Sequence, residues 1–280
     1  MVQDGASGMP SPAGDGPVAP GVGPGVREVA PGVVALTGLA ALPEEEDRAR
    51  VVVSTLARDV FAEGAHRVEA EIDPHDVHVR RVLQRAGLRP EGTGRGRGAV
   101  DGIPQDLLRL ARLRDDPAPG EPGAFLAMLN ATLPRKRVIV QGIVRDGQGR
   151  ILLCELTYKA DWDLPGGVAE PAESPVTSLE RELVEELGVE LGVGDLVAVD
   201  WLPPYRQWED AVLLVFDVGT HPDLDGRMTL QPSEIQGVHW VRPQDAAGYV
   251  APYVARLLSS LSDLPPGGCL FLEDGLPRGA

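Results

Sequence analysis

The chain has 280 residues, 43% of them hydrophobic and 24% charged, which suits one large soluble domain or two ordinary ones. Its 26 basic and 42 acidic residues give a net charge of −16, which argues against a nucleic-acid surface and against capture by an anionic membrane. No apolar run approaches the ~18 residues of a spanning helix, the N-terminus lacks a secretory pattern, and Cys154 and Cys269 alone do not suggest a disulfide framework. We therefore expect a cytoplasmic protein, and 24 Arg against 2 Lys suggest a bacterial genome rich in GC.

The first half of the chain is predicted to begin with a disordered tail. Residues 1–26 are dominated by Gly, Pro, Ala and Ser and have too few large apolar side chains to offset the entropy of ordering. Helices are expected at about 49–63 and 76–87, with a strand at 66–72 between them. Gly87 is a typical residue to end the second helix.

The middle of the chain leaves alternatives open. Residues 89–102 are rich in glycine and form a loop or an irregular strand, whereas 103–116 form a helix or a strand. Pro and Gly make 115–123 the best linker candidate, so residues 117–133 are expected to be a linker with a short helix.

The second half gives clearer strand signals. Apolar and β-branched runs predict strands at 137–145, 151–157, 196–201, 211–218 and 238–241. The turn DGQG joins the first two strands as a hairpin, and a closing helix is expected at about 244–261. Strands interleaved with helices predict an α/β sandwich over residues 134–264, followed by a C-terminal tail at 265–280.

A helix with strong end signals follows the second predicted strand. Ser174 can cap the free amides, Pro175 suits the first helical position, and Gly188 supplies the stop. Between these ends an apolar stripe at helical spacing docks the helix on the sheet; it consists of Val176, Leu179, Leu183 and Leu187.

Three carboxylates on this helix conflict with stability. Glu182, Glu185 and Glu186 repel one another at i, i+3 and i+4, and they lie in the last turns, where the helix dipole is already negative. A bound cation would resolve both conflicts. Hard oxygen ligands without Cys or His nearby favour Mg²⁺ or Mn²⁺ over Zn²⁺.

The arrangement as a whole resembles the signature of a known enzyme family. It reads Gly167, five residues, Glu173, seven residues, Arg181-Glu182-Leu183, one residue, Glu185-Glu186, one residue, Gly188-Val189. This spacing is similar at every position to the Nudix box, and the resemblance extends over about 135–262. It implies the Nudix α/β/α sandwich with a mixed sheet, and hydrolysis of a nucleoside diphosphate linked to another group.

The resemblance also implies roles for individual residues. Glu182 and Glu186 would be metal ligands, Glu185 a further ligand or the base that activates water, and Gly166 would add its carbonyl. Glu173 and Arg181 would form a structural ion pair between the loop and the helix, with Gly167 and Gly188 as structural turns.

The base and the substrate contacts stay open at the level of sequence. Glu234 and Glu209 are alternatives to Glu185 as the base. Phosphate could be held by Arg145, Lys159 or Arg206, and a nucleobase could stack on Trp201, Tyr205 or Trp208. After the box, Pro203 and Pro204 resemble the ADP-ribose subgroup and Tyr205 the dinucleoside-polyphosphate subgroup, so the substrate class is undecided.

Residues 33–116 resemble the C-terminal half of a GNAT acetyltransferase. The resemblance is carried by Val68-Glu69-Ala70, by the helix VRRVLQRAGL and by Glu91-Gly92. The glycine-rich loop expected before the first helix is replaced by ALPEEEDRAR, whose acids would repel a pyrophosphate. We expect a truncated, non-catalytic α/β segment that serves packing, dimerisation or regulation, and a homodimer is possible.

Two alternatives compete with the hydrolase. One is a non-catalytic Nudix module that senses a nucleotide or metabolite, although such a module would be expected to lose box glutamates. The other is an acetyltransferase completed by a partner chain, against which the missing loop argues.

Overall fold

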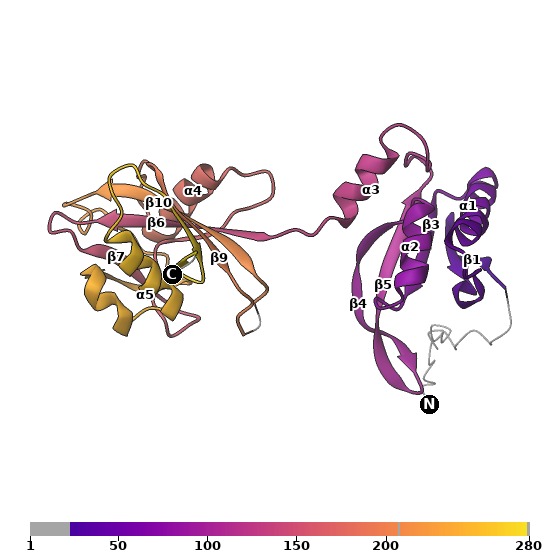
Figure 1. Ribbon diagram of the computed structural model, residues 1–280, viewed down its shortest axis with the longest axis horizontal. Coiled ribbons are helices and arrows are strands. Elements are labelled where there is room, and N and C mark those ends of the chain that lie inside the picture. Colours follow the sequence, from indigo (N-terminus) through magenta and orange to yellow (C-terminus); the bar gives the residue numbers. More distant parts are fainter. Residues whose placement is uncertain (1–22, 207, 279–280) are drawn as a thin grey trace, which may run out of the picture. The chain divides into compact units, whose positions relative to one another are not determined.

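The computed structural model describes residues 23–206 and 208–278. The chain folds as two compact units, Met1–Pro134 and Arg135–Ala280, each with its own sheet and core. Figure 1 shows both units and their elements. Among the described residues, no helix is both long and apolar enough to cross a membrane.

The N-terminal unit is built on a five-stranded sheet with the order β1-β2-β3-β5-β4. The strands are β1 (Gly25–Ala30), β2 (Val33–Thr37), β3 (Arg67–Ile72), β4 (Arg89–Val100) and β5 (Ile103–Leu113). β2 and β3 run parallel, and all other pairs run antiparallel. The two segments left open by the sequence are therefore both strands, joined as a long hairpin whose irregular register accommodates the glycines of β4.

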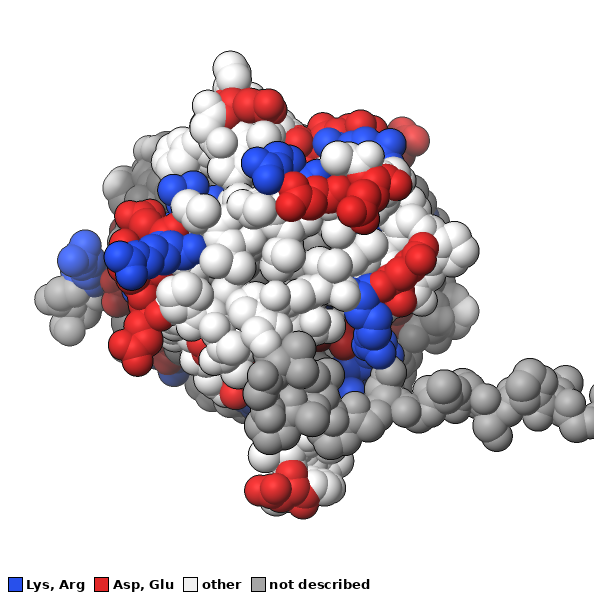
Figure 2. Space-filling model, turned by 90° about the vertical axis from the view of Figure 1, so that its right-hand side faces the viewer, with Lys and Arg blue, Asp and Glu red and all other residues white. Residues whose placement is uncertain are grey.

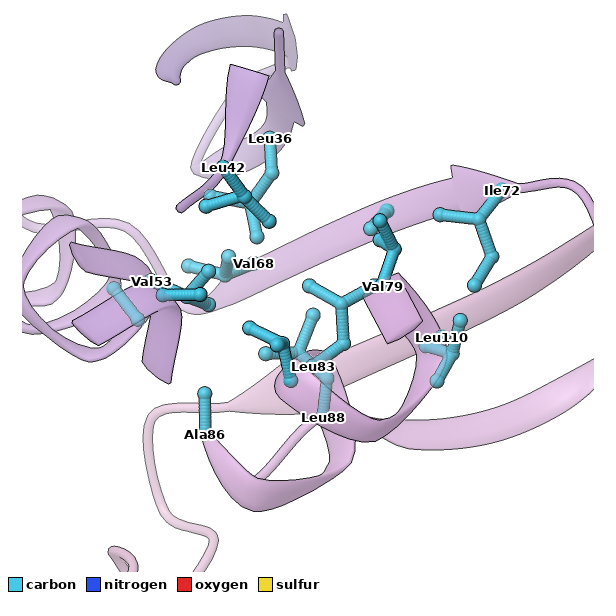
Figure 3. Packing of buried hydrophobic residues seen from close by; sticks show 14 of the residues in the cluster. Leu36, Leu42, Val53, Val68, Ile72, Val79, Leu83, Ala86, Leu88 and Leu110 are labelled. Atoms are coloured by element: carbon cyan, nitrogen blue, oxygen red, sulfur yellow. The ribbon is translucent and has the colours of Figure 1, made fainter. Parts of the chain in front are cut away.

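The helices α1 (Glu46–Ala62) and α2 (Val77–Arg85) and the short 3-10 turn η1 (Leu39–Ala41) pack with this sheet. α2 begins at Asp76, whose carboxylate accepts a hydrogen bond from the amide of Val79, and Gly87 follows its end with φ 93°. Figure 3 shows Val53 of α1 and Leu83 of α2 in the core beside Val68 of β3.

The predicted disordered tail overlaps the structure at its end. Residues 1–22 lie outside the described residues, but Gly25 and Val26 begin β1, which pairs with β2. The prediction of disorder to residue 26 was therefore wrong for these positions, because pairing with β2 supplies backbone hydrogen bonds that composition does not reveal. Figure 2 views the side that is on the right in Figure 1 and shows acidic and basic side chains interspersed around a broad area without charged side chains.

α3 (Ala124–Thr132) is the short helix of the segment between the two sheets. It follows Gly123, whose φ is 84°, and it buries none of its residues.

The C-terminal unit contains an eight-stranded mixed sheet with the order β11-β7-β6-β10-β9-β12-β13, and β8 pairs with β6 off this path. The strands are β6 (Arg137–Arg145), β7 (Ile151–Leu156), β8 (Gly166–Val168), β9 (Leu196–Leu202), β10 (Ala211–Thr220), β11 (Ile235–Val241), β12 (Leu270–Glu273) and β13 (Leu276–Pro277). β10 runs parallel to β6, and β12 runs parallel to β9. The five predicted strands are all present.

Helices cover both faces of this sheet, as the predicted sandwich requires. α4 (Pro175–Leu187) shares one core with Val140 and Val144 of β6, whereas α5 (Pro252–Leu261) shares the other with Ile143. Successive side chains of a strand point to opposite faces, so one apolar strand serves both cores. Figure 1 shows α4 and α5 on opposite sides of the strands.

The predicted hairpin between β6 and β7 forms only beside its turn. Arg145 pairs with Ile151, and further along β6 the ladder partner is β8, from Ile139 opposite Val168 to Gln141 opposite Gly166. This exchange brings the Gly166-Gly167 turn into the centre of the sheet.

Two predictions near the C-terminus were wrong. The closing helix is split into η2 (Pro243–Gly248) and α5, because Pro252 lacks an amide hydrogen and starts a new helix. The predicted tail is part of the sheet: β12 pairs with β9, and the amide of Gly275 donates to Asp200 across 2.9 Å. These paired segments are distant in sequence, so no local pattern predicts the pairing.

Candidate active site around the acidic helix

The helix that carries the three glutamates has the ends that its sequence predicts. The Ser174 side chain accepts a hydrogen bond from the amide of Thr177, and Gly188 ends the helix with φ 67°. Leu179, Leu183 and Leu187 are fully buried against the sheet. Val176, predicted to share their stripe, is 38% exposed.

Glu186 is the most enclosed of the three glutamates. It is 4% exposed, and its Oε2 accepts a hydrogen bond from the amide of Gly166 across 3.0 Å. Burial raises the pKa of Glu186 to about 8; the Gly166 bond opposes this rise, and the charges of Glu182 and Glu234 add to it. The site thus holds a carboxylate in a place that disfavours its negative charge.

Glu182 lies one turn earlier against the glycine turn. Burial raises its pKa, although Arg181 acts in the opposite direction. A Cβ added to Gly167 would lie 2.4 Å from Oε1 of Glu182, and one added to Gly166 would lie 2.1 Å from the carbonyl oxygen of Val140. The absence of a side chain at Gly166 therefore lets the turn approach the backbone of β6, and its absence at Gly167 lets the turn approach Glu182 of the acidic helix.

Arg181 joins the loop before the helix to the acidic face. Its Nε and Nη2 donate to the two oxygens of Glu173 across 2.9 and 3.1 Å, a bidentate pair that lowers the pKa of Glu173 to about 2. Its Nη1 reaches Glu185 at 2.8 Å and Glu182 at 3.1 Å. Glu185 is exposed and turned toward Arg181, so only Glu182 and Glu186 face the glycine turn.

A second polar cluster borders the turn on its N-terminal side. The buried carboxylate of Asp163 accepts from Nε2 of Gln141 at 2.7 Å, from the amide of Leu164 at 3.0 Å and from Nζ of Lys159 at 2.5 Å. Lys159, a predicted phosphate ligand, is therefore held by Asp163. Among the described residues, Oε1 of Gln141 is a buried acceptor without a donor. The sequence signal for Gln141 was a polar residue inside an otherwise apolar strand, and we missed it.

Two further residues reach the acidic helix from other strands. Glu234, a predicted alternative base, precedes β11, and its carbonyl accepts from the amide of Thr157 at 2.9 Å. Tyr158 follows β7. Partial burial, then the charges of Glu186 and other nearby carboxylates, raises the pKa of Tyr158 to about 12. No pattern in the sequence indicated Tyr158.

Several predicted substrate contacts are engaged with other residues. Arg145 forms an ion pair with Asp217 at 2.6 Å at the far end of β6. Arg206 stacks on Tyr205 in the β9–β10 connection, and Arg137 stacks on Trp208 there. The carbonyl of Glu209 accepts from Arg137, so this candidate base belongs to the same connection. These basic and aromatic side chains share a chemical type, but the fold gives them different partners.

The donor set at the glycine turn suits a hard divalent cation. Glu182 and Glu186 both have raised pKa values, so a cation would supply the countercharge that the protein withholds. Gly167 has no side chain, so the carboxylate of Glu182 can lie directly against the turn. In the described part of the chain, no three His, Cys, Asp or Glu side chains already converge as a finished ligand set. To join such a ligand set, Glu185 would have to release Arg181 and bind the ion.

Comparisons with known proteins agree with this arrangement. A NUDIX domain matches residues 135–261. The CTP pyrophosphohydrolase of Escherichia coli K12 is 35% identical over 46% of this chain and 94% of its own length. A MutT-like protein of Streptomyces ambofaciens is 32% identical over 48% of this chain and 82% of its own length. A crystal structure of a MutT protein from Methanosarcina mazei Go1 has a TM-score of 0.41 at 23% identity, over 46% of this chain and 95% of that chain.

The fold and the acidic helix thus define a hydrolase domain of the α/β/α sandwich type. The chain belongs to the Nudix hydrolase family.

Proposed function

We propose that the C-terminal unit is a pyrophosphohydrolase that depends on Mg²⁺ or Mn²⁺ and cleaves a nucleoside diphosphate linked to another group. The observation that supports this most directly is the burial of Glu186 against the amide of Gly166, beside Glu182. A structural carboxylate at this depth would be expected to have a basic partner, and neither glutamate has one that neutralises it fully.

Glu182, Glu186 and the carbonyl of Gly166 would hold the cation, with Glu185 as a further ligand or as the base. When bound, such a cation neutralises the charge on the phosphate oxygens and acidifies water. Through its ion pair with Glu173, Arg181 holds the loop before the acidic helix against that helix. This pairing fixes the carboxylates before the substrate arrives.

The reaction itself needs one proton acceptor. A water oxygen forms a bond to phosphorus, the bond from phosphorus to the bridging oxygen breaks, and the proton of the water passes to a carboxylate. Glu185 is our first choice for this carboxylate and Glu234 our second. The products are a nucleotide and the phosphorylated second group.

The names of the relatives narrow the range of substrates to test. One is a CTP pyrophosphohydrolase, and others are named nucleoside triphosphatases. We therefore propose a nucleoside triphosphate as the first substrate to test, with a nucleoside monophosphate and pyrophosphate as products.

The test is phosphate release from nucleoside triphosphates with added pyrophosphatase, and from ADP-ribose, dinucleoside polyphosphates, NADH and nucleotide sugars with added phosphatase. Activity should require Mg²⁺ or Mn²⁺ and fall by orders of magnitude in Glu186→Gln. Glu180→Gln, an exposed glutamate of the same helix, is the matched control and should keep its activity. A flat panel would instead favour a nucleotide-sensing module, which retention of all three box glutamates makes the weaker candidate.

For the N-terminal unit we propose a partial GNAT-like fold without catalysis, serving packing, dimerisation or regulation. The start of α1 supports the absence of a pyrophosphate site. Three acids, Glu45 to Asp47, lie there, and Glu46 pairs with Arg85 at 3.0 Å. The acidic side chains at this helix N-terminus already interact with the positive end of the helix dipole, which a bound phosphate would need. Binding of acetyl-CoA by the full chain, measured by calorimetry, would contradict this proposal.

A further inference from the structure

One side chain at the acidic helix stands out from its surroundings. Tyr158 is 67% exposed, yet the residues on either side of it are held firmly. Thr157 bonds to the β11 segment through its amide and through its hydroxyl, which donates to the carbonyl of Ser233 at 2.8 Å. Lys159 bonds to Asp163. The phenol is therefore presented to solvent from a fixed backbone.

The groups around this phenol are acidic. The carboxylates whose charges act on its hydroxyl are Glu186, Asp163, Glu234 and Glu182. Its neighbour Thr157 bonds to Ser233 and Glu234, and its neighbour Lys159 bonds to Asp163, so Tyr158 lies beside the Glu234 segment and beside the polar cluster that borders the glycine turn. A phenol is neutral near neutral pH and can donate a hydrogen bond, which a ring of carboxylates cannot do.

The basic side chains that could hold phosphate here are already engaged. Lys159 is bound to Asp163, and Arg181 is bound to Glu173 and Glu185. A diphosphate that enters this site therefore needs donors other than these cations, in addition to the metal.

We propose that the hydroxyl of Tyr158 binds the substrate by donating a hydrogen bond to a non-bridging phosphate oxygen. This inference rests on the proposed function and adds a residue that recognises the polyphosphate itself. Tyr158 is a binding residue in this scheme, and proton transfer stays with the glutamates.

The experiment compares wild type with Tyr158→Phe, which removes only the hydroxyl. With Mn²⁺ present, KM for the best nucleotide of the panel should rise roughly tenfold or more, as expected for loss of a hydrogen bond to a charged group, while kcat changes less than about twofold. The dissociation constants of α,β-methylene analogues of the four common ribonucleoside triphosphates should rise by the same factor. Mn²⁺ affinity, measured by electron paramagnetic resonance, should not change.

Tyr249→Phe is the matched control, because Tyr249 is exposed and its ring stacks on Trp162 without using the hydroxyl. Unchanged KM and analogue binding in Tyr158→Phe would overturn the proposal, as would an equal loss in the control or a parallel loss of Mn²⁺ affinity. Failure of every analogue to bind the wild type would also overturn it. If the wild type binds an analogue but hydrolyses nothing, the hydrolase proposal fails, and Tyr158 is judged by analogue binding alone.

Discussion

The amide of Gly166 donates a hydrogen bond to Oε2 of Glu186 across 3.0 Å, which joins the turn before the acidic helix to the last turn of that helix. Twenty residues of chain separate the two groups. The bond fixes a buried carboxylate beside a turn without side chains, and several measurable consequences follow from that geometry.

Metal should stabilise the folded protein through Glu186. Mn²⁺ at about 100 times its dissociation constant adds roughly 2.7 kcal/mol to the free energy of unfolding, which corresponds to a rise in Tm of several degrees for a unit of this size. Glu186→Gln should lose most of this rise, because an amide cannot supply the negative charge. Thermal denaturation with Mn²⁺ and then with excess EDTA measures the effect, and an equal rise in both proteins would show that the ion binds elsewhere.

Gly167→Ala should reduce activity without unfolding the protein. The new Cβ would lie 2.4 Å from Oε1 of Glu182, so that carboxylate must move away from the turn. We expect kcat/KM to fall by roughly 100-fold, because misplacement by about 1 Å has this order of effect. Gly192→Ala is the control, since nothing lies within 4 Å of a Cβ at Gly192. Full activity in Gly167→Ala would contradict a role for the position of Glu182.

Asp200 should make stability depend on pH. Burial raises its pKa to about 6, while the hydrogen bond from Gly275 opposes the rise, and its Oδ1 is buried without a partner among the described residues. A raised pKa means that the fold favours the protonated form, so its contribution is complete below pH ~4 and is lost as pH rises through about 6. The loss is roughly 2–3 kcal/mol.

Asp200→Asn should remove this part of the pH dependence. Denaturant unfolding of both proteins from pH 4 to pH 8 gives the difference in the free energy of unfolding, which should grow in favour of the variant as pH rises. A constant difference across that range would show that Asp200 does not titrate between these values.

Arg145 should contribute to stability and not to substrate binding. It is paired with Asp217 at 2.6 Å, and both side chains are about one third exposed. Arg145→Met should therefore lower the free energy of unfolding by roughly 0.2–1 kcal/mol and leave KM within about twofold. Steady-state kinetics on the best substrate of the panel checks this prediction. A tenfold rise in KM would show that Arg145 contributes to substrate binding.

Much of the acidic helix follows from local rules. Ser174, Pro175 and Gly188 define its ends through groups within a few residues, and the buried leucines follow from helical spacing. Local rules also locate β6 and β7, because an apolar run of this length can only be a buried strand or helix and its β-branched residues favour the strand.

The side-chain partners around the helix could not be predicted from local rules. Glu185 has the same chemistry as Glu186, yet it turns toward Arg181 while Glu186 is buried, and only packing against the sheet distinguishes them. Arg145 and Lys159 are both isolated basic residues in sequence. Their partners, Asp217 and Asp163, are set by strand order and loop path.

The sequence by itself determined the family, the acidic box and most helices and strands of the C-terminal unit, because these depend on spacing, capping and periodicity within about twenty residues. Only the complete fold shows that β8 replaces β7 beside β6, that residues 270–277 extend the sheet, and that the charges of Glu186 and Glu234 act on Tyr158. The physical reason is that a backbone amide or carbonyl accepts any partner of correct geometry. Pairings between distant segments therefore depend on how the whole chain packs.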